Sequence, residues 1–350
     1  MINETDFYSS RVLTDRIFNQ LFLFLGAPII LTGIISSILS TIMFLRDSFT
    51  PRSTKFILQT LSITDLLFLM SMIFYFELKI IYILYPHLEL TLKPIKEKFI
   101  FADFLVMLVN ISELFRNWLT VIIGIERFLV TCYPLKMTKY QDFNNSYLAV
   151  FSIGIFTFLL RLPMLIRRIT FYSTNQHMIQ ISQKSLKAHD IIEAIFQSFL
   201  PVTILLFCFI RITKALKKSK ALRIFHRSSA VSIKRKMHIT RMLIIIIILF
   251  SFCNTPHILN AIFQQLKIIN RNLISICWFF SILYSSSNFF VYIIYMKRYR
   301  LIISLMFSNK FCCPLTTIES LEAKYQLINS YRDRSNLRNR HPKTVNINSI

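Results

Sequence analysis

Seven long stretches of the chain are almost entirely apolar, and short polar segments separate them. Each stretch is close to the ~20 residues that an α-helix needs to cross a lipid bilayer. The predicted spans are residues 17–45, 56–76, 99–125, 147–166, 191–210, 242–266 and 272–296. The pattern therefore predicts an all-α membrane protein, folded as a seven-transmembrane helix bundle.

The third span carries one polar stripe between bulky apolar residues. Polar or small residues recur there in steps of three and four: Asn110, Glu113, Asn117, Thr120, Gly124 and Arg127. This spacing places them on one face of a helix. We expect that face to look into the bundle, while the other faces meet lipid or neighbouring helices.

Composition supports a membrane protein and argues against a soluble one. Of 350 residues, 54% are hydrophobic and only 17% are charged, and the mean hydropathy is +0.53. The net charge of +24 is compatible with a nucleic-acid partner. However, the basic residues gather between the apolar runs, so membrane topology explains them better and no nucleic-acid partner is expected.

The distribution of basic residues predicts the orientation. Segments 46–55, 126–146, 211–241 and 297–350 lie on one side of the membrane and hold 3, 3, 11 and 10 Lys and Arg, or 27 of 41. Because a basic excess marks the cytoplasm, the N-terminus is predicted outside. The sequon at Asn3 is then open to glycosylation, whereas the sequon at Asn144 is not.

The chain is predicted to have four parts. Residues 1–16 form an extracellular N-terminus and 17–296 the seven-transmembrane domain. Residues 297–313 have a basic start and an apolar face, which predicts an interfacial eighth helix with possible palmitoylation at Cys312 and Cys313. Residues 314–350 are polar and are predicted to form a disordered cytoplasmic tail.

Five stretches in the right order resemble rhodopsin-like (class A) G-protein-coupled receptors: LSITDLL, GIERFLVTCYPLK, FLPVTILL, ITRMLIIIIILFSFCNTP and SSSNFFVYIIYMKRYR. Within that class, WLTVIIGIERF, ITRM leading to CNTP, and SSSNFFVY resemble invertebrate neuropeptide receptors of the FMRFamide-receptor type. There are departures from the family pattern. Asn254 replaces a tryptophan, Ser37 replaces an asparagine, Phe289 replaces a proline, and Ala102 stands where a cysteine usually forms the outer disulfide.

The resemblance implies a transducing end at the cytoplasmic side. Its expected residues are Glu126, Arg127, Pro134, Leu135, Pro256, Asn288 and Tyr292. Pro256 cannot donate a backbone hydrogen bond, so span six is predicted to bend there. The cytoplasmic half of that span would then swing away from Arg127 and admit a helix of a heterotrimeric G protein.

Charged residues at mid-membrane depth predict a polar site in the bundle. Asp65, Arg116 and Asn288 lie ~13–16 Å from the inner mouth at ~1.5 Å of rise per residue. In the family this level holds a sodium ion, and Arg116 is a built-in cation that could replace it. Arg116 could pair with Asp65 or with Glu113, one helical turn away.

The upper half of the bundle holds the predicted ligand-binding candidates: Asn110, Glu113, His257, Asn260 and Gln264. Glu113 could meet a cationic group of a ligand, or it could simply neutralise Arg116. The resemblance argues against an amine receptor, because Val109 stands where those receptors carry an aspartate. It also argues against an opsin, because span seven has no lysine.

The resulting hypothesis is a plasma-membrane receptor that transduces binding of an extracellular neuropeptide into G-protein activation. One alternative is a chemosensory receptor for small molecules. A second, of a different class, is an ion-coupled transporter that uses Asp65, Glu113 and Arg116. No enzymatic activity, cofactor or metal is predicted, because no matching motif occurs in the sequence.

Overall fold

A computed structural model describes the backbone of residues 4–46, 50–84, 96–133, 143–173, 189, 191–223, 230–266, 271–295, 299–300 and 303. The chain divides into two units, Met1–Lys297 and Arg298–Ile350. The first unit holds the helices discussed below. Of the second, the structure describes only three positions, all within the predicted interfacial helix, so most of that helix and the whole tail lie outside the described residues, as do Cys312 and Cys313.

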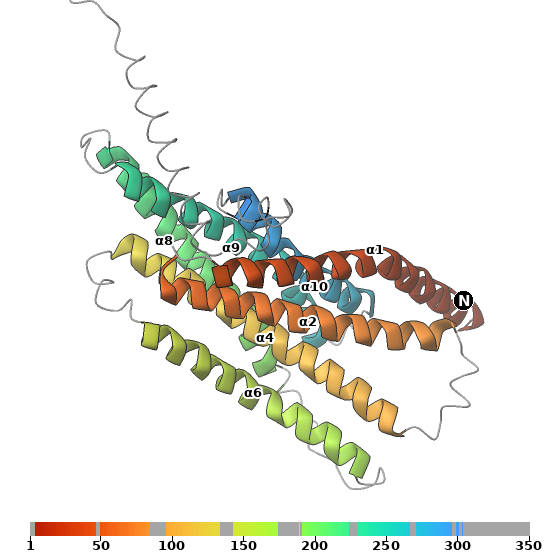
Figure 1. The fold of residues 1–350 in the computed structure, drawn as a ribbon. Helices are drawn as coiled ribbons and strands as arrows, with labels where there is room; N and C mark the ends of the chain where they lie inside the picture. The colour runs from red at the N-terminus through yellow and green to blue at the C-terminus, as the bar shows by residue number, and fades with distance from the viewer. Residues whose placement is uncertain are drawn as a thin grey trace, which may run out of the picture. The chain divides into compact units, whose positions relative to one another are not determined.

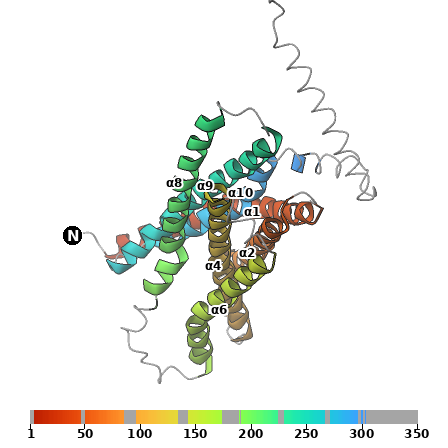
Figure 2. The same cartoon turned by 90° about the vertical axis from the view of Figure 1, so that its left-hand side faces the viewer.

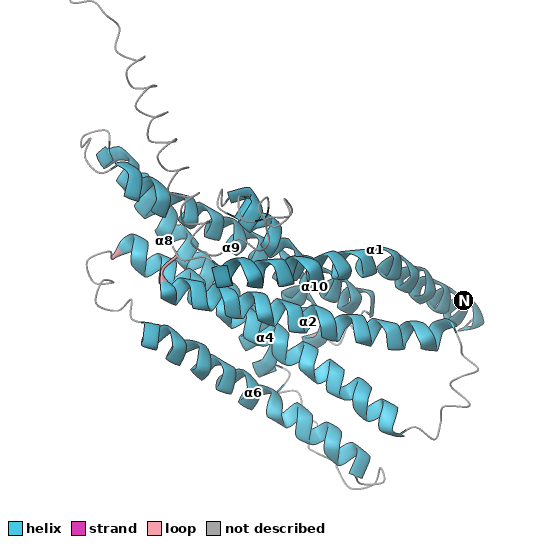
Figure 3. Cartoon of the chain, in the orientation of Figure 1, coloured by secondary structure: helices cyan, strands magenta, loops and turns pink. Residues whose placement is uncertain are grey.

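Every regular element among the described residues is helical (Figure 3). In chain order the helices are α1 (Glu4–Arg46), α2 (Arg52–Leu84), α4 (Lys96–Cys132), α6 (Phe143–Ser173), α8 (Leu200–Arg223), α9 (Ala230–Gln265) and α10 (Arg271–Tyr295) (Figure 1). A π-helical turn, η1 (Ile195–Phe199), leads directly into α8.

The described helices include seven that are long and apolar enough to cross a membrane. Their spanning segments are Phe24–Arg46, Arg52–Phe74, Phe104–Cys132, Asn145–Met164, Ile191–Lys217, Met242–Phe263 and Leu273–Tyr295. All seven overlap the spans expected from the apolar runs, so the predicted fold class is confirmed. The helices extend beyond several predicted spans, and α1 is already helical from Glu4.

Helix α4 is the central helix of the bundle. It contacts α2, α6, α8, α9 and η1, and Figure 2 shows it between α8 on one side and α2 on the other. Its polar stripe is buried as predicted, since Glu113, Asn117 and Thr120 are at most 1% exposed. Large apolar residues on other helices, such as Phe24 and Phe151, remain exposed, as lipid-facing residues do.

An apolar cluster packs α1, α2, α4 and α10 together beside the polar network of α4. It contains Ile30, Phe68, Leu69, Met72, Val109 and Ile282. Val109 is therefore a core residue, in keeping with the absence of an amine-binding aspartate at that position.

Close approach of α1 to its neighbours depends on Gly33. A Cβ atom at this position would lie 2.3 Å from Ser286 Oγ on α10 and 2.8 Å from Leu69 Cδ1 on α2. Ser286 Oγ in turn donates a hydrogen bond to the carbonyl of Ile29, one turn earlier on α1, at 3.1 Å. The missing side chain thus allows α10 to bond to the backbone of α1.

Candidate functional site

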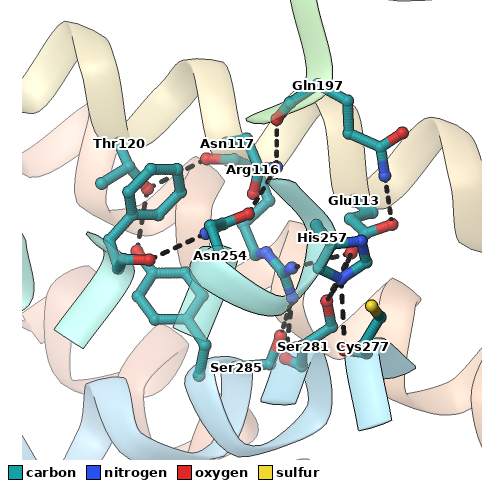
Figure 4. A network of polar contacts seen from close by, with 12 residues as sticks. Glu113, Arg116, Asn117, Thr120, Gln197, Asn254, His257, Cys277, Ser281 and Ser285 are labelled. Carbon is teal, nitrogen blue, oxygen red and sulfur yellow. Dashed lines mark hydrogen bonds and ion pairs between the residues drawn. The ribbon is translucent and has the colours of Figure 1, made fainter. Parts of the chain in front are cut away.

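The centre of the bundle holds a buried ion pair between Glu113 and Arg116. Both side chains come from α4 and are 1% exposed, and Arg116 Nη2 lies 3.8 Å from Glu113 Oε1. They are three residues apart, a spacing that brings side chains together on one helix face. Figure 4 shows this pair at the centre of a wider polar network.

Arg116 also bonds to α10. Its Nη1 donates to the carbonyl of Ser281 at 3.3 Å and to the hydroxyl of Ser285. The guanidinium carbon lies 4.5 Å from the centre of the Phe68 ring and 5.2 Å from that of Tyr284. The aromatic faces and the α10 oxygens therefore replace the water that the cation loses on burial.

Both carboxylate oxygens of Glu113 are engaged by other helices. Ser281 Oγ donates to Oε1, and His257 Nε2 on α9 lies 3.4 Å from the same atom. Gln197 Nε2, in the π-turn η1, donates to Oε2 at 2.8 Å. Glu113 is thus already neutralised and hydrogen-bonded before any ligand arrives.

Asp65 has a different hydrogen-bond partner. Asn288 Nδ2 on α10 donates to Asp65 Oδ2 at 2.8 Å, and the charge of Arg116 acts on Asp65 through space. Of the two pairings open for Arg116, the structure has the direct contact with Glu113. Asp65, Arg116 and Asn288 nevertheless belong to one electrostatic cluster, at the level where the sequence predicts a midplane site.

The π-turn supplies acceptors to α4. The backbone N–H of Leu200 donates to the carbonyl of Ile195, five residues back. Pro201, one residue later, has no N–H to donate, so backbone carbonyls of η1 remain open. Asn117 Nδ2 donates to the carbonyl of Gln197 at 2.9 Å, and Trp118 Nε1 donates to that of Phe196 at 3.1 Å.

A second ion pair joins the network through Gln197. Arg161 on α6, 2% exposed, pairs with Glu193 through Nη1. Its Nη2 donates to Gln197 Oε1 at 3.0 Å. The Gln197 amide therefore lies between a guanidinium and the carboxylate of Glu113, with its oxygen toward the cation and its nitrogen toward the anion.

The position of Asn254 gives α9 a polar contact with α4. Asn117 Nδ2 lies 3.5 Å from Asn254 Oδ1, and Asn254 Nδ2 donates to the carbonyl of Phe250 at 2.9 Å. One turn further along α4, the hydroxyls of Thr120 and Tyr284 are hydrogen-bonded at 2.9 Å. Hydrogen bonds thus connect α4 to α9, α10 and η1 through its middle third.

At the Cys132 end of α4, Glu126 and Arg127 are both buried. Glu126 Oε1 accepts hydrogen bonds from Thr54 Oγ1 at 2.6 Å and Ser53 Oγ at 3.2 Å, both on α2. Among the described residues, Nε and Nη2 of Arg127 have no hydrogen-bond partner. Within the described part of the chain, this end of the helix therefore holds a buried cation, two of whose nitrogens have no acceptor.

Comparison with known proteins gives one family. The sequence model described as 7 transmembrane receptor (rhodopsin family) matches residues 37–295, which covers all seven spanning helices in whole or in part. The chain belongs to the rhodopsin family of seven-transmembrane receptors. No curated protein matches its sequence. Members of this family are membrane receptors that couple to G proteins, and this receptor is a multi-pass membrane protein of that kind.

The remaining ligand candidates of the receptor are only partly placed. Asn110 and Asn260 are half-buried. His257 Nε2 lies 3.1 Å from the Cys277 carbonyl and 3.0 Å from Ser281 Oγ, so its ring faces α10. The side chain of Gln264 lies outside the described residues.

Several residues expected at the transducing end are buried in the receptor. Asn288 and Tyr292 lie on α10, where the Tyr292 ring meets Phe44 of α1 edge-on, with 5.3 Å between centroids. Pro256 lies inside α9, which continues through it. Pro134 and Leu135 lie outside the described residues, as does Asn3.

Sequence reasoning assigned no role to much of the network, including Gln197, Ser281, Ser285 and the Arg161–Glu193 pair. Arg161 is a charge near the end of an apolar run, and such a charge needs a partner. A buried ion pair at Arg161 could therefore have been predicted from the sequence. The serines carry no comparable signal. Among the described residues, no group of three or more His, Cys, Asp or Glu could hold a metal ion.

Proposed function

We propose that the receptor binds an extracellular peptide and transduces that binding into heterotrimeric G-protein activation at the plasma membrane, with its N-terminus outside. The proposal of a peptide ligand rests mainly on the contacts that Glu113 already makes inside the bundle. Its two oxygens are engaged by Ser281, Arg116, His257 and Gln197. A small cationic ligand that needs a free carboxylate deep in the bundle would have to displace these contacts.

The sequence supports the same choice. The stretches WLTVIIGIERF, ITRM leading to CNTP, and SSSNFFVY resemble receptors of the FMRFamide type, and Val109 is a packed core residue rather than an amine-binding acid. A peptide can make contacts over a wide surface near the helix ends and does not need one deep ion pair. Asn110, His257 and Asn260 are the candidate contacts among the side chains that are described.

Transduction would use the free donors of Arg127. Thr54 and Ser53 bond to Oε1 of Glu126, and among the described residues neither Oε2 of Glu126 nor Nε and Nη2 of Arg127 has a hydrogen-bond partner. These donors could bond to carbonyl groups of an entering G-protein helix. Movement of α9 about Pro256 would open the space, and Tyr292 and Asn288 on α10 would adjust with it.

The polar contact between Asn117 and Asn254 gives this movement a starting point. Asn254 lies two residues before Pro256 and bonds within α9 to the carbonyl of Phe250. A ligand that shifts α4 or η1 changes the partners of Asn117, and hence the packing of α9. In this receptor the link is a chain of hydrogen bonds, where relatives carry a tryptophan at position 254.

A panel of amidated peptides, tested on membranes from cells that express the chain, examines this function. We expect at least one peptide to accelerate guanine-nucleotide exchange on a co-expressed G protein, and membranes without the receptor to show no response. Exchange driven only by small non-peptide odorants would favour the chemosensory alternative. Peptide-independent ion flux without nucleotide exchange would favour the transporter.

A further inference from the structure

Glu193 is the one carboxylate of the described network that is partly open. Its side chain is 23% exposed, whereas Glu113 is 1% exposed and Asp65 is 2% exposed. It lies near the start of the span Ile191–Lys217, at the opposite end from the basic segment 211–241. Under the proposed orientation, this end of the span faces the outside.

Among the described residues, the two oxygens of Glu193 are unequally engaged. Oε1 pairs with Arg161. Oε2 lies 3.7 Å from His189 Nδ1, which is longer than a hydrogen bond. A carboxylate has about four acceptor positions, so Glu193 can take a second cation at Oε2 without releasing Arg161.

The carboxylates of the cluster outnumber its guanidiniums. Among the side chains that the structure describes, it contains three carboxylates, of Asp65, Glu113 and Glu193, and two guanidiniums, of Arg116 and Arg161. Glu193 is the most exposed of the three carboxylates, so it is the one that an added cation can reach.

Gln197 connects Glu193 to the central ion pair. Arg161 holds Glu193 with one nitrogen and the Gln197 amide oxygen with the other, and the Gln197 nitrogen holds Glu113. The amide cannot flip without placing its nitrogen against the guanidinium and its oxygen against the carboxylate. A change at Glu193 therefore reaches Glu113 and Arg116 through fixed hydrogen bonds.

From these contacts we propose that Glu193 binds a positively charged group of the ligand, a guanidinium or an ammonium. This proposal rests on the proposed function, because it assigns a charge to the peptide. The site comprises Glu193, Arg161, His189 and Gln197. Binding at Oε2 adds a positive charge and weakens the hold of Arg161 on Glu193, which alters the Gln197 bridge to Glu113.

The test uses a small probe, so that the peptide need not be known. Purified full-length receptor is heated with N-acetyl-arginine amide or with N-acetyl-citrulline amide, its uncharged analogue. We expect only the arginine compound to raise the Tm, and Glu193→Gln to weaken its apparent affinity by about tenfold or more, because charge-assisted hydrogen bonds are the stronger kind. Glu193→Asp should retain most of the effect.

Arg161→Gln should change the affinity for the arginine compound in the opposite direction from Glu193→Gln. It removes a nearby positive charge that repels an incoming cation, so the arginine compound should bind more tightly than in the wild type. If Glu193→Gln alone is too unstable to purify, Arg161→Gln/Glu193→Gln removes both charges and should still abolish the response. An equal Tm rise with both probes, no rise in the wild type, or an unchanged rise without Glu193 would overturn the proposal.

Failure of this proposal and failure of the proposed function give different results. If no amidated peptide promotes nucleotide exchange while the arginine probe still binds at Glu193, the peptide hypothesis is wrong and the site stands. If a peptide activates the wild type and Glu193→Gln with equal potency, and its citrulline analogue is as potent, the receptor is a peptide receptor and the cation site is wrong.

Discussion

Arg116 shows how a full charge is kept inside this bundle. The guanidinium contacts Glu113, two oxygens on α10 and the faces of Phe68 and Tyr284. Removing the two charges from water costs about as much free energy as their attraction gains. The ion pair itself therefore adds little net stability. Removal of one member is different, because the other charge is then buried without compensation.

A double-mutant cycle should reveal the partner of Arg116. Arg116→Met or Glu113→Gln alone should each destabilise the receptor by roughly 3–5 kcal/mol, and the double substitution should recover part of the loss. Coupling of Arg116 to Asp65 should be weaker, because Asp65 bonds to Asn288 instead. Thermal unfolding of the purified receptor measures both couplings.

Arg211→Met provides the control, since Arg211 is exposed on α8 and surface charges contribute little. Stronger coupling of Arg116 to Asp65 than to Glu113 would contradict the geometry of the network.

The same residue gives a prediction about sodium. Relatives hold a sodium ion beside the acid of their second span, and here the charge of Arg116 already acts on Asp65. Agonist affinity should therefore be equal in sodium chloride and in N-methylglucamine chloride. Radioligand competition on membranes measures it, and Arg116→Met should create sodium sensitivity. A wild-type receptor whose agonist affinity falls in sodium would refute the idea of a built-in cation.

The sequence predicted which residues lie on the buried polar face of α4 better than it predicted the contacts of their side chains. The three- and four-residue steps on α4 identified a buried polar face, because helix geometry relates spacing to direction. Glu113 and Arg116 were recognisable as charges in an apolar run. Their contacts with Ser281, Ser285 and Gln197 depend on how α10 and η1 pack against α4, which no local pattern encodes.

Among the elements, η1 shapes the site most directly. An extra residue in the turn and the missing N–H of Pro201 leave the carbonyls of Phe196 and Gln197 open to Trp118 and Asn117. The sequence contains Pro201, whose missing N–H disturbs the helical hydrogen bonds one turn before it. It does not say whether the helix kinks or widens, since that choice depends on the donors available on α4.

Glycine substitutions test the packing between helices. Gly33→Ala should destabilise the receptor by about 1–3 kcal/mol, because its Cβ would lie 2.3 Å from Ser286 Oγ. Gly154→Ala is the matched control on α6, where the nearest atom, Phe115 Cε2, is 3.7 Å from the added Cβ. It should be neutral or stabilise the receptor by about 0.5–1 kcal/mol, since alanine favours helices.

Thermal unfolding of the two glycine variants, with surface expression as a second readout, checks this difference. Equal effects at the two positions would mean that α1 does not approach α2 and α10 as closely as described.

For the whole molecule, seven apolar runs predicted seven spanning helices, because the bilayer imposes both length and hydrophobicity on each span. The helix ends were less predictable. Helix α1 is helical well before its predicted span, and α9 begins in the basic segment 211–241. Outside the bilayer a helix can continue through polar sequence, so the end of an apolar run does not mark the end of a helix.

Membrane orientation is the prediction that belongs to the whole chain. The excess of Lys and Arg in alternate connections predicts that the N-terminus lies outside. Asn3 should then carry N-linked sugar in cells, and Asn144 should not. Glycosidase shift assays on Asn3→Gln and Asn144→Gln distinguish them. Sugar on Asn144 would reverse the topology and, with it, the sides assigned to Glu193 and Arg127.

We propose that this receptor turns ligand binding into G-protein activation through Arg127. Guanine-nucleotide exchange on a G protein, measured in membranes with an activating amidated peptide, tests it most directly. The wild type and the control Arg211→Gln should both respond, whereas Arg127→Gln should bind the peptide and lose at least about tenfold of the exchange rate, because the buried donors of Arg127 are gone. Exchange that is unchanged by Arg127→Gln, or absent from the wild type with every peptide, would rule out transduction of peptide binding through Arg127.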